Sequence, residues 1–121
     1  MQLRTIPRRE WQRFFDRFTR LHSGAIVSVN VSGSIFGCHN AIVAQPLGGI
    51  SGDGNDVLIH IEARRRLDHV GHRVPGVRAV RLQQTDEGAV AALDFETADG
   101  TRTAVRFRSP IIPELLDPAV E

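Results

Sequence analysis

The sequence predicts an α+β fold, in which an N-terminal amphipathic helix packs on a small antiparallel β-barrel or strongly bent sheet of six to seven strands. Apolar residues recur at helical spacing near the start of the chain and alternate at strand spacing through most of the remainder. Turns containing Gly or Pro separate the alternating segments at short intervals, which is typical of barrels and sandwiches. With 121 residues, we expect a single domain: a helix over about 7–22, a β region over about 25–108 and a proline-containing tail over 109–121.

An aromatic stripe defines the predicted helix. Its residues occur at i, i+3, i+4, i+7 and i+10 and so share one helix face: Trp11, Phe14, Phe15, Phe18 and Leu21. Pro7 fits the first turn, where its missing N–H needs no partner, and Gly24 follows the last turn. Such a helix is not stable alone, so we expect Phe14, Phe15 and Phe18 to be buried against the sheet.

The β region divides into seven candidate strands: 25–31, 35–44, 57–62, 69–74, 77–82, 90–96 and 103–108. The stretch "GGISGDG" is expected to be a mobile loop, because neither a Gly-Lys-Ser sequence nor a helix follows it to make a phosphate site. "DGND" is expected to be a turn, since Leu58 and Arg64 stand where a calcium loop needs Gly and Glu.

The last two strands permit a specific prediction of register. A three-residue loop ending at Gly100 pairs Leu93 with Val105, so that the apolar residues of both strands share one face. A two-residue turn would instead place an arginine opposite Leu93. The three-residue loop requires Gly100 at positive φ and sets Glu96 opposite Arg102 on the outer face.

Composition limits the compartment and the classes of partner. The net charge is +1 and all 15 basic residues are arginine, so no global field draws the chain to nucleic acid or to a membrane. Cys38 is the only cysteine, which excludes an internal disulfide, and we expect it to be a small core residue. Its neighbour His39 would point to the other face of a strand, so the two cannot form a nucleophilic pair.

The first residues lack the apolar run of a secretory signal, and no apolar run could span a bilayer. We therefore expect a cytoplasmic bacterial or archaeal protein with no membrane partner.

Three of the five histidines, His60, His69 and His72, lie close together in the sequence and raise the question of a metal or catalytic site. A zinc site needs three or four converging ligands, whereas residues three apart point to opposite sides of a strand. A central glycine and a following proline disfavour a helix over the last two histidines. We interpret the three as polar strand and loop positions, and expect no metal, no cofactor and no catalytic residue.

Two groups of arginines are candidates for phosphate contacts: Arg9, Arg13, Arg17 and Arg20 on the helix, and Arg64, Arg65 and Arg66 after a strand. The Phe and Trp side chains are assigned to the core, which leaves no aromatic faces for stacked bases. We interpret both groups as solvated surface. The residues of any interaction surface are expected to be Arg64, Arg65, Arg66, His60, His69 and His72.

Both ends of the chain resemble a family of short uncharacterised bacterial proteins, domain of unknown function 5335. The segments that carry the resemblance are "RTIPRREWQRFFDRFTRLHSG" and "VRLQQTDEGAVAALDFETADGTRTAVRFRSP", and the closing "DGT…RFRSP" is the most distinctive part. The resemblance covers nearly the whole chain. It implies a small stand-alone domain and carries no known activity, substrate or catalytic residue.

Three classes of function remain open from the sequence. The favoured one is a non-catalytic binding or protein-interaction module, whose partner is another protein or a second copy of this chain. The alternative is a nucleic-acid-binding domain that uses the arginine clusters, because a helix followed by short bent strands resembles the Sm-like architecture; a shared fold is a weak guide to function. The third is an enzyme that uses the loop histidines, against which the strand parity argues.

Overall fold

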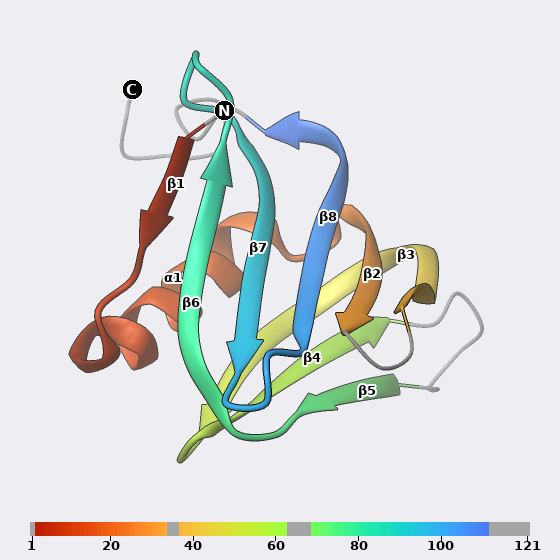
Figure 1. Cartoon of the computed structure of the whole chain (residues 1–121). Helices are drawn as coiled ribbons and strands as arrows, with labels where there is room; N and C mark the ends of the chain where they lie inside the picture. The colour runs from red at the N-terminus through yellow and green to blue at the C-terminus, as the bar shows by residue number, and fades with distance from the viewer. Residues whose placement is uncertain (1, 34–36, 63–68, 112–121) are drawn as a thin grey trace.

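The computed structural model describes residues 2–33, 37–62 and 69–111, with the backbone alone described at 69, 70, 110 and 111. These residues form one short α-helix, a 3₁₀ turn before it and eight strands (Figure 1). In chain order the elements are β1 (Gln2–Thr5), η1 (Arg8–Glu10), α1 (Trp11–His22), β2 (Ile26–Gly33), β3 (Gly37–Asp53), β4 (Asp56–Glu62), β5 (His69–Val74), β6 (Val77–Gln84), β7 (Val90–Thr97) and β8 (Arg102–Ile111).

The α+β class and the antiparallel pairing are confirmed, but the strand number and the closure differ from the prediction. The eight strands form one sheet in the order β1-β6-β7-β8-β2-β3-β4-β5. The sequence prediction of six to seven strands missed β1, whose residues are all exposed and so show no buried face to detect. Within the described residues β1 and β5 do not pair, so the sheet stays open and is not a closed barrel. In Figure 1, β3 and β4 run obliquely to β6, β7 and β8.

Helix α1 contributes its aromatic face to the core, as its periodicity predicts. Phe15 and Phe18 are buried, and Phe14 is partly buried against the same apolar cluster. The Phe15 ring lies 6.1 Å from that of Phe95 on β7, and the Phe18 ring lies 5.8 Å from that of Phe107 on β8. The helix is therefore part of the core rather than a cover at its edge.

The prediction of a mobile loop at "GGISGDG" is wrong, because residues 48–53 form the end of β3, which pairs with β4, and only Gly54 lies in the turn. A Cβ atom at Gly49 would lie 2.8 Å from Cγ2 of Thr19 on α1, so glycine is required where helix and strand meet. The Thr19 hydroxyl donates to the carbonyl of Ile50 (3.1 Å) and accepts from its N–H (2.9 Å). The glycines thus permit close packing of α1 against β3. The sequence alone does not show this packing, because a glycine-rich segment is also typical of a loop.

Strand β3 also continues through Pro46, beyond residue 44, where the predicted strand ends. Pro46 pairs with Ile26 of β2, and Leu47 next to it pairs with Ile61 of β4. The proline therefore lies where β3 changes partners. A residue without an N–H is tolerated at such a break in the ladder.

The predicted register of the last hairpin is confirmed. Leu93 pairs with Val105 and Glu96 pairs with Arg102. The N–H of Thr97 donates to the carbonyl of Thr101 (2.9 Å), which leaves three residues in the loop. Gly100 has φ +88°.

Replacing Gly100 by alanine should lower the free energy of unfolding by about 1 kcal/mol, because a Cβ atom disfavours positive φ. The measurement is urea denaturation at neutral pH. Gly71→Ala on β5 is the matched control, since neither glycine has a heavy atom within 4 Å of an added Cβ and only Gly100 has a positive φ. Equal effects of the two changes would contradict the assignment of the cost to φ.

Candidate functional site

The structure separates the predicted histidines. Ile59 pairs with His72 and His60 pairs with Gly71, so His60 and His72 face opposite sides of the β4–β5 ladder. The side chain of His69 and the whole of Arg64, Arg65 and Arg66 lie outside the described residues. Among the residues that are described, no group of three or more His, Cys, Asp or Glu side chains is arranged to hold a metal ion.

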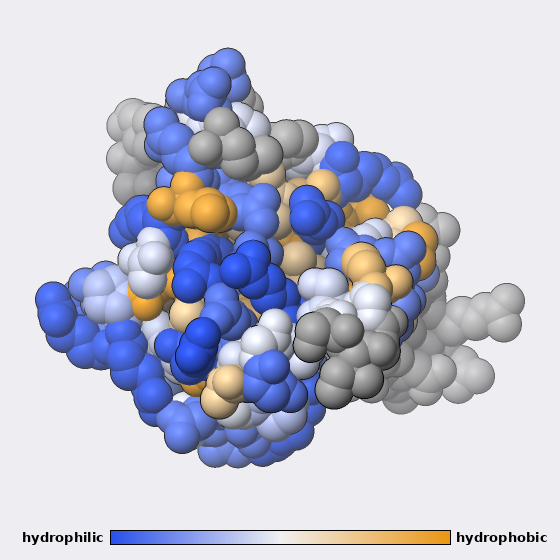
Figure 2. All heavy atoms as spheres, in the orientation of Figure 1, coloured by the Kyte–Doolittle hydropathy of each residue, from blue (hydrophilic) through white to orange (hydrophobic). Residues whose placement is uncertain are grey.

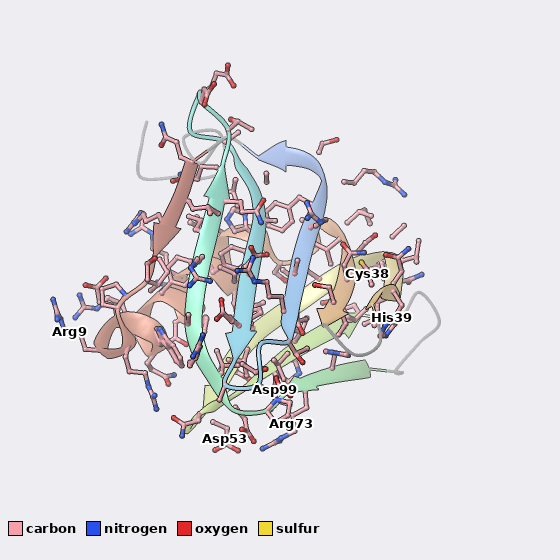
Figure 3. All side chains as sticks on the ribbon, in the orientation of Figure 1. Arg9, Cys38, His39, Asp53, Arg73 and Asp99 are labelled. Atoms are coloured by element: carbon pink, nitrogen blue, oxygen red, sulfur yellow. The ribbon has the colours of Figure 1, made fainter. Side chains whose placement is uncertain are left out.

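The prediction that Cys38 is a core residue is wrong, because Cys38 is exposed. His39 beside it is exposed too, as are all residues over 37–41. Exposure at consecutive strand positions means that this part of the β2–β3 ladder extends past the core. Figure 3 shows Cys38 and His39 together at the margin of the molecule, away from Arg9 on the opposite side.

Several arginines of the sheet are held by carboxylates. Glu96 accepts hydrogen bonds from Arg78 (2.6 Å) and Arg81 (2.9 Å), and Arg102 lies 3.5 Å away. The hydrogen bonds from Arg78 and Arg81 lower the pKa of Glu96 to about 2. This cluster joins β6, β7 and β8 on the outer face, as expected for the Glu96–Arg102 pair.

A second ion cluster lies near the β5–β6 turn. Arg73 is 2.7 Å from Asp56 and 3.4 Å from Asp53, and Figure 3 shows Asp53 and Arg73 at the same end of the molecule. The backbone N–H of Gly76 and the side chain of Arg73 both donate to Asp56 and lower its pKa. These arginines stabilise turns and strand pairs, and so are weak candidates for phosphate binding.

A Ser–His contact that sequence reasoning missed joins β3 to β4. The Ser51 hydroxyl lies 3.0 Å from Nε2 of His60. Asp16 of α1 lines the same open groove. Among the described residues no hydrogen bond orients the other ring nitrogen of His60, which a catalytic pair requires. This contact could have been predicted from the sequence. A two-residue turn inside "DGND" pairs the flanking strands so that Ser51 and His60 are diagonal neighbours on one face.

The strongest candidate site is a cavity of about 350 Å³ between α1 and strands β1, β6 and β7, which we call the α1–β6 cavity. Its walls are the apolar side chains of Phe14, Phe18, Leu21, Leu82 and Val90. Its polar lining residues are Arg4, Arg17, His22 and Gln84. A small, mainly apolar pocket with a few polar groups is the usual form of a small-molecule site, for which volumes run from roughly 300 to 1,000 Å³.

The α1–β6 cavity has a buried base and an exposed rim. Phe18, His22 and Leu82 are 3%, 3% and 5% exposed, whereas Arg4 and Arg17 are exposed. Arg4 pairs with Leu82 across β1 and β6, and directly paired residues point to the same face, which brings the guanidinium over the cavity. Apolar walls therefore lie between a cationic rim and an imidazole at the base.

His22, the last residue of α1, is the buried polar group of the cavity. Its ring centroid lies 4.5 Å from that of Phe18 and 5.1 Å from that of Phe107. Burial lowers the pKa of His22 from 6.5 to about 4, so the imidazole is neutral near pH 7. Its Nδ1 atom has no hydrogen-bond partner among the described residues. An unsatisfied buried polar atom costs about 1–3 kcal/mol.

Sequence reasoning overlooked His22, although a signal was present. His22 follows Phe18 by four residues and therefore lies on the aromatic face of the helix.

Fold and cavity together define an α+β domain in which one helix packs on an open antiparallel sheet and a small cavity separates the helix from strands near one sheet edge. The chain belongs to the family described as "Family of unknown function (DUF5335)", whose model matches residues 2–114. This result confirms the resemblance seen in the sequence.

A relative in the bacterium Aquifex aeolicus (strain VF5), named only "Uncharacterized protein", is 24% identical over 113 residues. The match covers 93% of this chain and 97% of the relative. No solved structure gives a significant match to the chain. Within the described residues, no helix is long and apolar enough to cross a membrane.

Proposed function

We propose that the protein is a non-catalytic binding module and that the α1–β6 cavity is its ligand site. The observation that carries this proposal is the cavity itself, which has a volume of about 350 Å³ and is walled mainly by apolar side chains with a few polar residues beside them. A ligand whose apolar part enters this cavity removes apolar surface from water, which favours binding.

The chemistry of the cavity lining supports binding rather than catalysis. Among the described residues that line it, none carries a hydroxyl, a thiol or a carboxylate. Nucleophilic and acid–base reactions need such groups beside the imidazole. The Ser51–His60 pair lies in a different groove, which is lined from α1 by Asp16, Thr19 and Arg20.

The test uses p-cresol, a neutral ring with one hydroxyl, followed by two-dimensional amide NMR of the purified protein. We expect saturable shifts concentrated at cavity residues such as Leu21, Gln84 and Val90. Leu21→Trp fills the cavity and should abolish the shifts. Arg13→Trp places the same ring on an exposed part of α1 and is the matched control. Shifts that survive Leu21→Trp, or that never saturate, would contradict the proposal.

The nucleic-acid alternative gains no support from the described arginines, several of which pair with carboxylates. We expect binding to mixed single-stranded RNA to be weak and to vanish near physiological salt, as measured by fluorescence anisotropy. Replacing Arg64, Arg65 and Arg66 by Ser should change RNA binding as little as the charge-matched control, Arg9, Arg13 and Arg20 to Ser.

A nucleic-acid site would give a different result. The logarithm of affinity would fall with the logarithm of salt concentration by about 0.7 per neutralised phosphate on single strands. Loss of three contacts at 64–66 would then reduce that slope by roughly two units. Submicromolar binding at physiological salt, abolished only by the 64–66 change, would establish the alternative.

Partner and compartment complete the proposal. Among the described residues β1 and β5 are the edge strands of the sheet, and an edge strand is a candidate surface for pairing with a protein or a second copy. On β1 the side chain of Leu3 is 61% exposed, while Figure 2 shows this face of the molecule as mainly hydrophilic with separate apolar patches. We also propose a cytoplasmic location, with which a chain that can form no internal disulfide is compatible. Native mass spectrometry of purified protein measures subunit number and retained ligand together.

A further inference from the structure

We propose that the protein has a second ligand site in a cavity of about 450 Å³ between β5 and the β7–β8 hairpin, which we call the β5–hairpin cavity. Its ligand is a neutral small molecule with an apolar body and one hydrogen-bonding group, which meets the imidazole of His72. Among the described residues this cavity shares no lining residue with the α1–β6 cavity, so the two sites are independent.

The β5–hairpin cavity lies between inner faces of the bent sheet. On one side, Val31 of β2 pairs with Thr103 of β8, and Thr103 pairs with the buried Phe95 of β7. Directly paired residues share a face, so Val31 and Thr103 point towards the core. On the other side, Val74 of β5 pairs with the buried Val57 of β4 and so also points inward. The space between the inner faces of a curved sheet is a common place for a small-molecule site, as in the mouths of β-barrels.

The register of β5 directs His72 into this space. His72 pairs with the fully buried Ile59 and stands two residues before Val74, so its side chain is on the inner face of the strand. It lines the cavity. Unlike His22, it is only half-buried, and neither of its ring nitrogens is an unpartnered atom closed off from the solvent. A ligand in the cavity can therefore contact the imidazole.

The charged residues of the lining are already paired within the chain. Arg73 lies 2.7 Å from Asp56, and Asp99 accepts hydrogen bonds from the Thr97 hydroxyl and from the N–H of Thr101. Figure 3 shows Arg73 and Asp99 at the same end of the molecule. The described lining thus contains one charged group of each sign, both with partners. A charged ligand would lose hydration on entry without gaining an unpaired group of opposite sign, which favours a neutral one.

The imidazole supplies the hydrogen bond. Burial lowers the pKa of His72, and the charge of the nearby His39 lowers it further. The ring is therefore neutral near pH 7, with one nitrogen as donor and the other as acceptor. A hydroxyl on the ligand suits either nitrogen, because a hydroxyl both donates and accepts. The apolar body of the ligand contacts the apolar part of the lining, which consists of Val31, Val74, Pro75 and Ala98.

Four probes that share one methylphenyl ring test the ligand class: toluene, p-cresol, 4-methylbenzoate and 4-methylbenzylammonium. They carry respectively no polar group, a neutral hydroxyl, an anion and a cation. Affinities are measured at pH 7 from the amide NMR shifts of His72, Val74 and Thr101. We expect p-cresol to bind about threefold to tenfold tighter than toluene through the hydroxyl. Both charged probes should bind more weakly than p-cresol.

Two matched variants assign the hydroxyl gain to its residue. His72→Phe keeps an aromatic ring and should abolish the gain while leaving toluene affinity unchanged, as a cycle of ligand and protein changes measures. His60→Phe makes the same change on β4, on the opposite face of the β4–β5 ladder, and should keep the gain. If His72→Phe does not fold, the ranking of the four probes on the natural protein still decides.

The outcomes separate this site from the one proposed above. Shifts confined to Leu21, Gln84 and Val90 overturn the β5–hairpin site and leave the function of the α1–β6 cavity intact. Shifts confined to the β5–hairpin cavity support the second site and overturn the first. Equal affinities for toluene and p-cresol, or tighter binding of a charged probe, overturn the ligand class. A hydroxyl gain that survives His72→Phe overturns the role of His72.

Discussion

Replacing Phe18 by alanine should lower the free energy of unfolding by about 3–5 kcal/mol, measured by chemical denaturation at neutral pH. Phe18 is 3% exposed and packs against Phe107 and His22, so the change removes a buried ring at the junction of α1 and β8. The same change widens the α1–β6 cavity, whose base Phe18 lines. An unfilled cavity adds to the cost of the lost burial.

Phe14→Ala is the matched control for this prediction, because Phe14 lies on the same helix and is only partly buried. Its effect should be clearly smaller. A loss of less than about 1 kcal/mol for Phe18→Ala would show that α1 contributes little to the stability of the core.

The free energy of unfolding should rise with pH between about 4 and 6.5, by at most about 3 kcal/mol, and then level off. Burial lowers the pKa of His22 from 6.5 to about 4. In this window the unfolded chain therefore binds a proton that the folded chain does not, and acid favours unfolding.

His22→Phe should remove most of this pH dependence, as measured by denaturation at several pH values. The stability of the variant near pH 7 should be unchanged or raised, since the change replaces an unsatisfied polar ring by an apolar one. A smaller dependence should remain, because burial and the nearby His39 also lower the pKa of His72. His60→Gln, at an exposed position, is the control. Parallel curves for the natural protein and His22→Phe would contradict the prediction.

The carboxylates act in a separate range of pH. Hydrogen bonds from Arg78 and Arg81 hold the pKa of Glu96 at about 2, below its usual value of 4.5. The stability from this cluster is fully present above pH 4.5 and is lost as the pH falls towards 2. Above pH 4.5 the change of stability with pH therefore reports on His22 without a contribution from Glu96.

Local patterns were sufficient where one element determined the outcome. The spacing from Trp11 to Leu21 predicted α1 and the burial of Phe15 and Phe18, because helix periodicity decides which side chains share a face. Alternation and the position of Gly100 predicted the register of the β7–β8 hairpin, because both strands and their loop are contiguous in sequence. The pairing of Glu96 with Arg102 followed from that register.

Local patterns failed where distant segments meet. The glycines of β3 looked like a loop until α1 was placed against them, with Thr19 at the position a Cβ of Gly49 would need. Cys38 was predicted to be a core residue, but the start of β3, which carries it, extends past the core. Ser51 and His60 came together only once the β3–β4 turn was known.

The sequence by itself determined the α+β class, the helix with its buried face, the register of the last hairpin and the family. It could do so because those properties depend on residues within a few turns or one hairpin of each other. Only the tertiary structure decided that the sheet stays open and that the α1–β6 cavity exists. The cavity depends on β1, α1, β6 and β7 meeting in space, and on an imidazole whose burial comes from Phe107 on β8. Burial and hydrogen-bond satisfaction are properties of the assembled core, and no single segment of the chain contains them.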